Sequence, residues 1–183
     1  EGVGNWPQDV TAQMVANFLR GGAGINVLAR HIGARITVVD MGVAADLAPH
    51  PLLISRKINK GTHNMTKGPA MSREEAIKAI ETGIEIVNAE LAKGMDIAGT
   101  GDMGIGNTTP SAAIAAVITG TPVSDVTGHG TGIDDKQLQH KIDIISKAIR
   151  INAPDRRDPL DVLAKVGGFE IGGLAGVILG AAA

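Results

Sequence analysis

The sequence predicts an α/β protein in which a parallel or mostly parallel sheet is flanked by helices. Short apolar segments alternate with longer segments in which apolar residues recur at helical spacing. The 183 residues include 25 glycines but only one Trp and two Phe, which favours an aliphatic core with many tight turns over a β-sandwich. A chain of this length suits one domain, so we expect residues 1–183 to form a single α/β domain.

Charge and composition exclude several classes of protein. The chain has 17 Lys and Arg against 19 Asp and Glu, so it lacks the broad basic face that binds nucleic acid or an anionic membrane. The absence of Cys excludes disulfides and thiolate zinc sites. The chain does not open with the basic and then apolar residues of a signal peptide, and we expect a cytoplasmic protein.

The first third of the chain predicts helices followed by a strand. Asp9 is the expected N-cap of a helix to about Ala29. The glycines within 21–24 either divide it into two helices or let another backbone approach closely. Residues 35–40 are predicted to form a buried strand that ends in a carboxylate, and residues 52–58 a weaker extended segment.

The remaining elements have recognisable start signals. Ser72 to Glu75 is a capping box for a helix that ends at Gly94, and residues 95–98 are predicted to form a short strand. The last 13 residues, 171–183, form a segment too short to span a bilayer. Their apolar composition predicts a buried helix that stops without a cap. Further helices are expected from Pro110 to about 119, from a cap at Asp134 or Asp135 to about 150, and after Asp158-Pro159.

The glycine-rich run from Gly99 to Pro110 is the most informative segment. It leaves the predicted strand and enters the predicted helix, which is where open α/β sheets bind ligands. Its four glycines let backbone amides face one concavity. Together with the helix dipole and two Thr hydroxyls, these amides favour an anion such as a phosphate. An ordinary glycine-rich turn is the other interpretation.

Two common phosphate loops do not match this run well. No Lys lies in it, which excludes a Walker A motif. Gly99, Gly101 and Gly104 satisfy G-x-G-x-x-G, but the predicted helix begins too far beyond the third glycine for a dinucleotide fingerprint. A nucleotide-dependent oxidoreductase stays an alternative. Asp125 stands at the distance of its acidic ribose-binding residue, although in a Thr- and Pro-rich turn.

Polar residues near the two glycine-rich loops are candidates for ligand contacts. Asp102 is a candidate for contact with sugar hydroxyls or a ring N–H, and the other interpretation is an Asx residue that stabilises the turn. Lys141 could reach toward an anion at the sheet edge, although most helical lysines are solvated. We expect His140 and Lys60 to be solvated as well.

A second glycine-rich loop, residues 127–132, precedes two adjacent aspartates. His129 with Asp134 and Asp135 could bind a metal ion. Adjacent Asp residues before a helix are more often caps, and no second His stands at ligand spacing, so we predict no metal.

Amide side chains near the start of the chain surround one indole. Asn5, Gln8 and Gln13 could recognise a flat heteroaromatic ring on which Trp6 stacks. Capping and packing explain these residues equally well.

Five segments together resemble one enzyme family. The chain is similar in these segments, in order over its whole length, to the nicotinate-nucleotide–dimethylbenzimidazole phosphoribosyltransferases, which make the lower-ligand nucleotide of cobalamin. The resemblance implies a Rossmann-like large domain with a parallel sheet, a smaller helical domain and a homodimer. The segments are PQDVTAQM (7–14), KGT (60–62), GDMGIGNTTP (101–110), GIDD (132–135) and GGFEI (167–171).

The family resemblance also implies the reaction and the roles of residues. The phosphoribosyl group of nicotinate mononucleotide is transferred to 5,6-dimethylbenzimidazole or a similar aromatic base, with no cofactor and no metal. Asn5 and Gln13 correspond to part of the benzimidazole pocket, and Asp102 to an acidic group near the ribose and the reacting base. The other expected substrate contacts are Met103, Gly104, Ile105, Gly106, Asn107, Thr108 and Lys141.

This chain departs from the family in three respects. Asp102 stands where many members have Glu, which shortens its reach, and Asn5 stands where relatives often have Ser, so the aromatic acceptor stays open. Members are longer, with a small helical domain and a C-terminal segment that carries the glutamate general base. Glu170 lies in a different motif and is not expected in that role. We therefore expect a central large-domain portion that binds the nucleotide but turns it over poorly. A non-catalytic binding or assembly relative is a second alternative.

Overall fold

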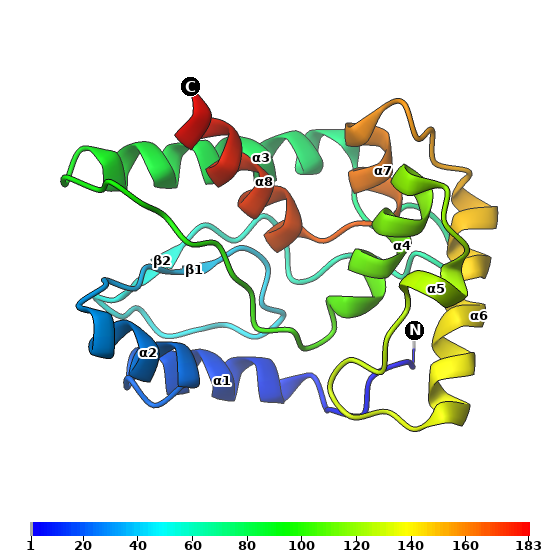
Figure 1. Ribbon diagram of the computed structural model, residues 1–183, viewed down its shortest axis with the longest axis horizontal. Coiled ribbons are helices and arrows are strands. Elements are labelled where there is room, and N and C mark those ends of the chain that lie inside the picture. Colours follow the sequence, from blue (N-terminus) through cyan, green and yellow to red (C-terminus); the bar gives the residue numbers. More distant parts are fainter. Residues whose placement is uncertain (1) are drawn as a thin grey trace. The chain divides into compact units, whose positions relative to one another are not determined.

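The computed structural model describes residues 2–183, in which helices accompany one small parallel sheet (Figure 1). The predicted α/β class with a parallel sheet is confirmed. The residues form two compact units, 6–61 on the one hand and 2–5 with 62–183 on the other, and the expectation of a single domain stays a prediction. The elements are α1 Asp9–Leu19, α2 Gly24–Ile32, β1 Val38–Asp40, β2 Leu53–Ser55, α3 Arg73–Leu91, α4 Thr108–Thr119, α5 Val123–Val126, α6 Asp135–Asn152, α7 Pro159–Val166 and α8 Phe169–Ala182.

The helical part of unit 6–61 consists of two helices, which settles the alternative left open by its glycines. Asn26, in the first turn of α2, donates to the Phe18 carbonyl over 3.1 Å and accepts from the Ala23 amide over 3.0 Å, which fixes the break between the helices. The prediction of Asp9 as N-cap is wrong. Gln8 holds that position, and Asp9 lies in the first turn, where negative charge also favours the helix dipole.

The two strands of unit 6–61 are parallel, with Val38 opposite Leu53 and Asp40 opposite Ser55. Both strands are shorter than the predicted segments. Asp40, only 3% exposed, forms an ion pair of 2.9 Å with Lys57. Its other carboxylate oxygen accepts from the Gly42 and Val43 amides over 3.1 and 2.8 Å, so this carboxylate holds the turn that follows β1.

In unit 2–5 with 62–183, α3 begins with the predicted capping box. The Ser72 hydroxyl accepts from the Glu75 amide over 3.1 Å, and the Glu75 carboxylate accepts from the Ser72 amide over 2.9 Å. Helices α3 and α8 lie side by side (Figure 1). Their backbones approach so closely that a Cβ atom on Gly83 would overlap the Gly173 carbonyl oxygen. The small residues of α8 therefore fix its packing on α3.

The aliphatic core of this unit lies between α4, α6 and α7. Ile145 from α6 is fully buried against the small residues of α4, and Val162 and Val166 of α7 complete the cluster. Outside this core, Lys141 in the N-terminal half of α6 lies beside Thr108 at the start of α4. None of the helices in residues 2–183 has both the length and the apolar composition needed to cross a membrane.

Three sequence predictions in this unit are wrong in detail. Residues 95–98 form no strand, because no strand of the described chain pairs with them, and Ile97 is 90% exposed. Helix α4 begins at Thr108, so Pro110 lies within its first turn, where the missing N–H costs little. The predicted buried tail is buried on one face only, and Ile178 and Leu179 are exposed on the other.

Candidate functional site

A hollow of about 470 Å³ lies in unit 2–5 with 62–183, where the glycine-rich run enters α4, and we name it the polar hollow after the charged, amide and hydroxyl side chains among its lining residues. The start of α4, the loop before α6 and one side chain of α6 line this open hollow. Its volume is in the range of small-molecule sites. The lining residues are Asp102, Asn107, Thr108, Ser111, Ala112, Ala115, Val126, Gly128, Gly130 and Lys141.

Lys141 is the cation of this hollow. Its side chain is only 2% exposed, and its Nζ donates to the Thr108 hydroxyl over 2.8 Å and to the Gly128 carbonyl over 3.1 Å. Within the described residues it forms no ion pair with a carboxylate. Burial lowers the pKa of Lys141, because desolvation disfavours its charged form. A buried ammonium group without a counter-ion favours binding of an anion.

Gly130 keeps the space beside Lys141 open. A Cβ atom at this position would lie 2.9 Å from the Thr108 hydroxyl oxygen and 3.3 Å from the Lys141 Nζ. The residue also has a φ of +61°, which L side chains rarely adopt. Both the backbone conformation and the close approach therefore require glycine here.

The N-terminus of α4 supplies amide donors to the same hollow. Asn107 is the N-cap residue, but its side chain does not bond to the first amides of the helix. Pro110 has no N–H. Within residues 2–183, no acceptor is recorded for the amides of Thr108 and Thr109. These two donors and the positive end of the helix dipole are therefore available to an anion.

In the glycine-rich run before α4, two glycines adopt backbone conformations that other residues rarely adopt. Gly104 and Gly106 have φ values of +75° and +82°. Asp102 accepts from the Gly104 amide over 2.7 Å, so its interpretation as a turn-stabilising Asx residue is confirmed. Asp102 also lines the hollow, and its contact with a substrate stays a prediction. Met103 and Ile105 are half-buried in the loop between these residues.

The two amides predicted for an aromatic pocket belong to different units. Asn5 donates to the Gly132 carbonyl over 3.1 Å and accepts from Gln137 over 2.5 Å, which ties it to the start of α6. Gln13 lies on α1, where it donates to Asp9 over 2.9 Å. Trp6 is 53% exposed and belongs to the same unit as Gln13. Their common role in one pocket stays a prediction.

The remaining polar candidates occupy ordinary surface positions. Asp134 is the cap of α6 and accepts from the Gln137 amide over 2.8 Å, while His129 and Asp135 pair over 3.0 Å on the surface. Lys60 pairs with Asp46 over 2.7 Å. His140 is exposed. In residues 2–183, no three His, Asp or Glu side chains gather as metal ligands would.

The role of the second glycine-rich loop was missed from the sequence. From residues 127–132 and the aspartates after them we considered a metal site and favoured helix caps, whereas Gly128 and Gly130 line the polar hollow. The left-handed backbone of Gly130 could not be read from the sequence. The repeated glycines directly before the helix that carries Lys141 were the available signal.

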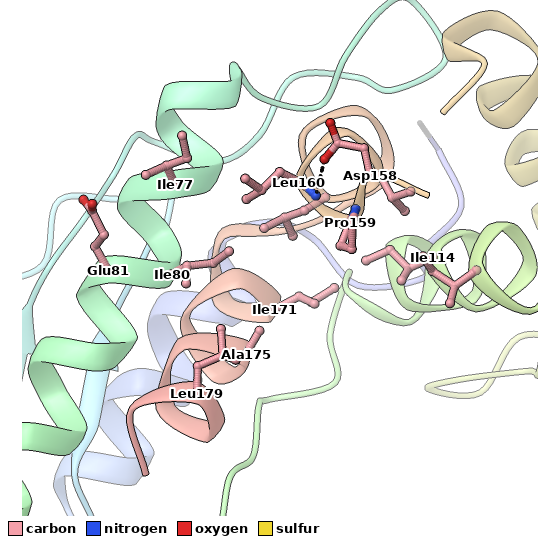
Figure 2. A pocket seen from close by; sticks show the side chains of 13 residues that line it. Ile77, Ile80, Glu81, Ile114, Asp158, Pro159, Leu160, Ile171, Ala175 and Leu179 are labelled. Atoms are coloured by element: carbon pink, nitrogen blue, oxygen red, sulfur yellow. Dashed lines mark hydrogen bonds between the residues drawn. The ribbon is translucent and has the colours of Figure 1, made fainter. Parts of the chain in front are cut away.

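A second hollow, of about 580 Å³, lies between α3, α4, α7 and α8 (Figure 2). Isoleucine and leucine side chains such as Ile80, Ile114 and Leu179 point into it (Figure 2). The Asp158 carboxylate at its rim accepts from the Leu160 amide over 3.1 Å and caps α7. This hollow offers no cation, so it does not fit a phosphate.

The oxidoreductase alternative is not favoured by the structure. A dinucleotide fingerprint requires a strand directly before its first glycine, and residues 95–98 form none. Asp125 lies exposed in the short helix α5 and accepts from the Ser124 hydroxyl over 2.8 Å, rather than standing at the end of a strand.

Comparison with known proteins gives consistent matches. A family model described as phosphoribosyltransferase matches residues 1–183. The nicotinate-nucleotide–dimethylbenzimidazole phosphoribosyltransferase of Dehalococcoides mccartyi strain BAV1 is 64% identical over 98% of this chain and 51% of its own length. That of Desulforudis audaxviator strain MP104C is 62% identical over 100% of this chain and 52% of its own length.

A solved structure agrees with these relatives. The crystal structure of CobT from Thermus thermophilus is similar with a TM-score of 0.93 and 42% sequence identity, over 99% of this chain and 54% of that chain. The chain thus spans about half the length of the relatives it matches. Because the family model covers every residue, the chain belongs to this phosphoribosyltransferase family.

Proposed function

We propose that the polar hollow binds the 5′-phosphate and ribose of nicotinate mononucleotide, as part of an enzyme that transfers the phosphoribosyl group to 5,6-dimethylbenzimidazole or a similar aromatic base. The products would be α-ribazole 5′-phosphate and nicotinate, in the biosynthesis of cobalamin. The printed names of the relatives support the reaction. Since the chain spans about half their length, we assign substrate binding to these residues. We do not assign to them the removal of the proton from the aromatic acceptor.

The environment of Lys141 is the main support for this proposal. It is buried, it has no carboxylate partner in the described residues, and it lies beside the Thr108 hydroxyl at the open end of α4. A phosphate bound there would accept hydrogen bonds from the Thr108 and Thr109 amides, the Thr108 hydroxyl and the Lys141 ammonium group. Charge-assisted bonds of this kind are about twice as strong as neutral ones.

The residues of the hollow would contribute to catalysis by position and charge. Displacement at C1′ of the ribose passes through a state with oxocarbenium character, so the phosphate must be held while the incoming ring nitrogen approaches. Fixing both reactants supplies much of such a rate enhancement. Asp102, on the loop that lines the hollow, would face the sugar and stabilise the positive charge that develops on it. Asn5 and Gln13 would contact the aromatic acceptor.

Calorimetry with two ligands tests the binding proposal. The 183-residue chain should bind nicotinate mononucleotide and should bind nicotinate riboside, which lacks the phosphate, at least about 100-fold more weakly, since two or more charge-assisted bonds are lost. Equal affinity for the two ligands would show that the phosphate is not held. A chromatographic assay for α-ribazole 5′-phosphate checks the reaction. Fast turnover by these 183 residues would contradict the assignment of proton transfer to another segment.

The family resemblance also leads us to propose a cytoplasmic homodimer. Sedimentation velocity at several protein concentrations tests the oligomeric state, with twice the 18.7 kDa chain mass as the expected result. A purely monomeric distribution at all concentrations would overturn this part of the proposal.

A further inference from the structure

The second glycine-rich loop, residues 127–132, has to keep one conformation for the polar hollow to stay open. Gly128 and Gly130 line the hollow, and Gly130 lies against both the Thr108 hydroxyl and Lys141. Three of the six loop residues are glycine, which loses more conformational entropy on folding than any other residue. The loop therefore depends on contacts outside it to keep one conformation.

Buried groups hold the first end of this loop. Thr127 is only 8% exposed, and its hydroxyl donates to the Val123 carbonyl over 2.6 Å. The next carbonyl, that of Gly128, accepts from the Lys141 Nζ over 3.1 Å. These two bonds attach the first end of the loop to α5 and to the cation of the hollow.

A residue from the start of the chain holds the second end. The Asn5 side-chain nitrogen donates to the Gly132 carbonyl over 3.1 Å, across 127 positions of the sequence. The Asn5 side-chain oxygen accepts from the side-chain nitrogen of Gln137, in the first turn of α6, over 2.5 Å. The start of the chain thus lies beside the loop and the start of α6 (Figure 1), and Asn5 joins the two.

Gln137 determines which way the Asn5 amide points. The Gln137 side-chain oxygen accepts from the Asp134 amide over 3.0 Å in the capping box of α6, so the Gln137 nitrogen is the atom that faces Asn5. An amide nitrogen only donates, so it selects the oxygen of Asn5 and turns the Asn5 nitrogen toward the Gly132 carbonyl. The capping box, Asn5 and the end of the loop therefore form one connected set of hydrogen bonds.

We infer that Asn5 is a positioning residue of the phosphate site. By holding the Gly132 carbonyl, it keeps the loop in the conformation that leaves space beside Lys141. The inference rests on the proposed function and adds to the contact with the aromatic acceptor proposed for Asn5. It differs from that contact in one consequence, since Asn5 should affect binding of the nucleotide even when no aromatic base is present.

Two variants test this inference by calorimetry with nicotinate mononucleotide and no aromatic base. N5A removes the bond to the Gly132 carbonyl, so the nucleotide must order the loop when it binds and should bind about threefold to tenfold more weakly. Q137E should give a similar loss. A Glu side chain preserves the capping box, but its carboxylate cannot donate to the Asn5 oxygen and instead attracts the Asn5 nitrogen away from Gly132.

Matched variants separate this hydrogen bond from an effect of charge. Gln139 is exposed on α6, two positions after Gln137. Q139E introduces the same negative charge as Q137E and should change the affinity by less than about twofold, because exposed charges interact weakly. In an N5A background, Q137E should likewise change the affinity by less than about twofold, because the bond that it disturbs is already absent.

Two further measurements identify the phosphate site as the part that Asn5 affects. Nicotinate riboside, which lacks the phosphate, should bind to N5A within about twofold of its affinity for the wild type in an NMR titration. In the free proteins, nitrogen-15 relaxation should show faster motion of the Gly130 and Gly132 amides in N5A and Q137E than in the wild type and Q139E. A general loss of stability would not produce this pattern.

Each outcome decides between the two proposals. If the wild type does not bind the nucleotide, the proposed function fails, and this inference fails with it. If the wild type binds and N5A binds equally well, the proposed function stands and the inference is overturned. Equal losses for the nucleotide and the riboside in N5A would also overturn it, because Asn5 would then act outside the phosphate site.

Discussion

The Nζ of Lys141 lies 2.8 Å from the hydroxyl oxygen of Thr108, a residue 33 positions earlier in the chain. This contact joins the middle of one helix to the first residue of another and places a buried ammonium group beside open backbone amides. It is the geometry on which the proposal of an anion site in the polar hollow rests. The predictions that follow test this site and the packing that supports it.

Replacing Lys141 with Met should separate binding from stability. K141M should weaken nicotinate mononucleotide binding by at least about 30-fold, because a buried charge partner is removed. Its thermal midpoint should not fall, since desolvation of the ammonium group is no longer required. Lys147 is exposed on the same helix, and K147M should change neither quantity. A K141M protein that binds normally would contradict the anion site.

Replacing Gly130 with Ala should fill the space beside Lys141. The new Cβ would crowd Thr108 and Lys141, and the left-handed backbone would be strained by about 1 kcal/mol. We expect at least about tenfold weaker binding together with this loss of stability. Gly94 has a φ of +80° but open surroundings, so G94A should show similar strain with unchanged binding. Equal binding by both variants would show that the space is not used.

Glu170 should make stability depend on pH. Burial raises the pKa of Glu170 above its ordinary value of 4.5, and the Asp102 charge raises it further. The folded protein thus keeps this proton to higher pH than the unfolded chain does. The free energy of unfolding should therefore fall as pH rises from about 4.5 through the raised pKa, and E170Q should remove that component. Urea titrations of both proteins across this range measure it, and identical pH profiles would contradict the predicted shift.

Replacing a glycine at the contact between α3 and α8 should lower the free energy of unfolding. A Cβ on Gly176 would overlap the Ile80 carbonyl oxygen, a backbone atom that cannot move without shifting the helix. G176A should lower the free energy of unfolding by about 3 kcal/mol, the upper end of ordinary overpacking. Gly24 begins α2 in open space, and G24A should have no such effect. A G176A protein as stable as the wild type would show that the two helices can separate at little cost.

The local start signals of the helices could be predicted from the sequence because they depend on a few neighbouring residues. The capping box at Ser72 and the caps at Asp134 and Asp158 all form as expected. The strand predicted at residues 95–98 failed for the opposite reason. A strand depends on a distant partner, and the apolar pattern of those residues says nothing about whether one is present.

The local parts of the candidate site could likewise be predicted from the sequence, whereas the parts that depend on tertiary packing could not. Backbone amides at the start of α4 follow from a glycine-rich run before a helix, which is a local pattern. That Lys141 belongs to this site depends on how α6 packs beside α4, and its spacing alone predicted a solvated side chain. The position of Gly130 beside Thr108 and Lys141 depends on tertiary contacts in the same way.

A crystal structure of the chain with nicotinate mononucleotide tests the central claim most directly. We expect the 5′-phosphate oxygens at hydrogen-bond distance, about 3 Å, from the Thr108 and Thr109 amides and from the Lys141 Nζ. A phosphate bound elsewhere, with these donors unchanged and Lys141 still bonded only to Thr108 and Gly128, would contradict the account.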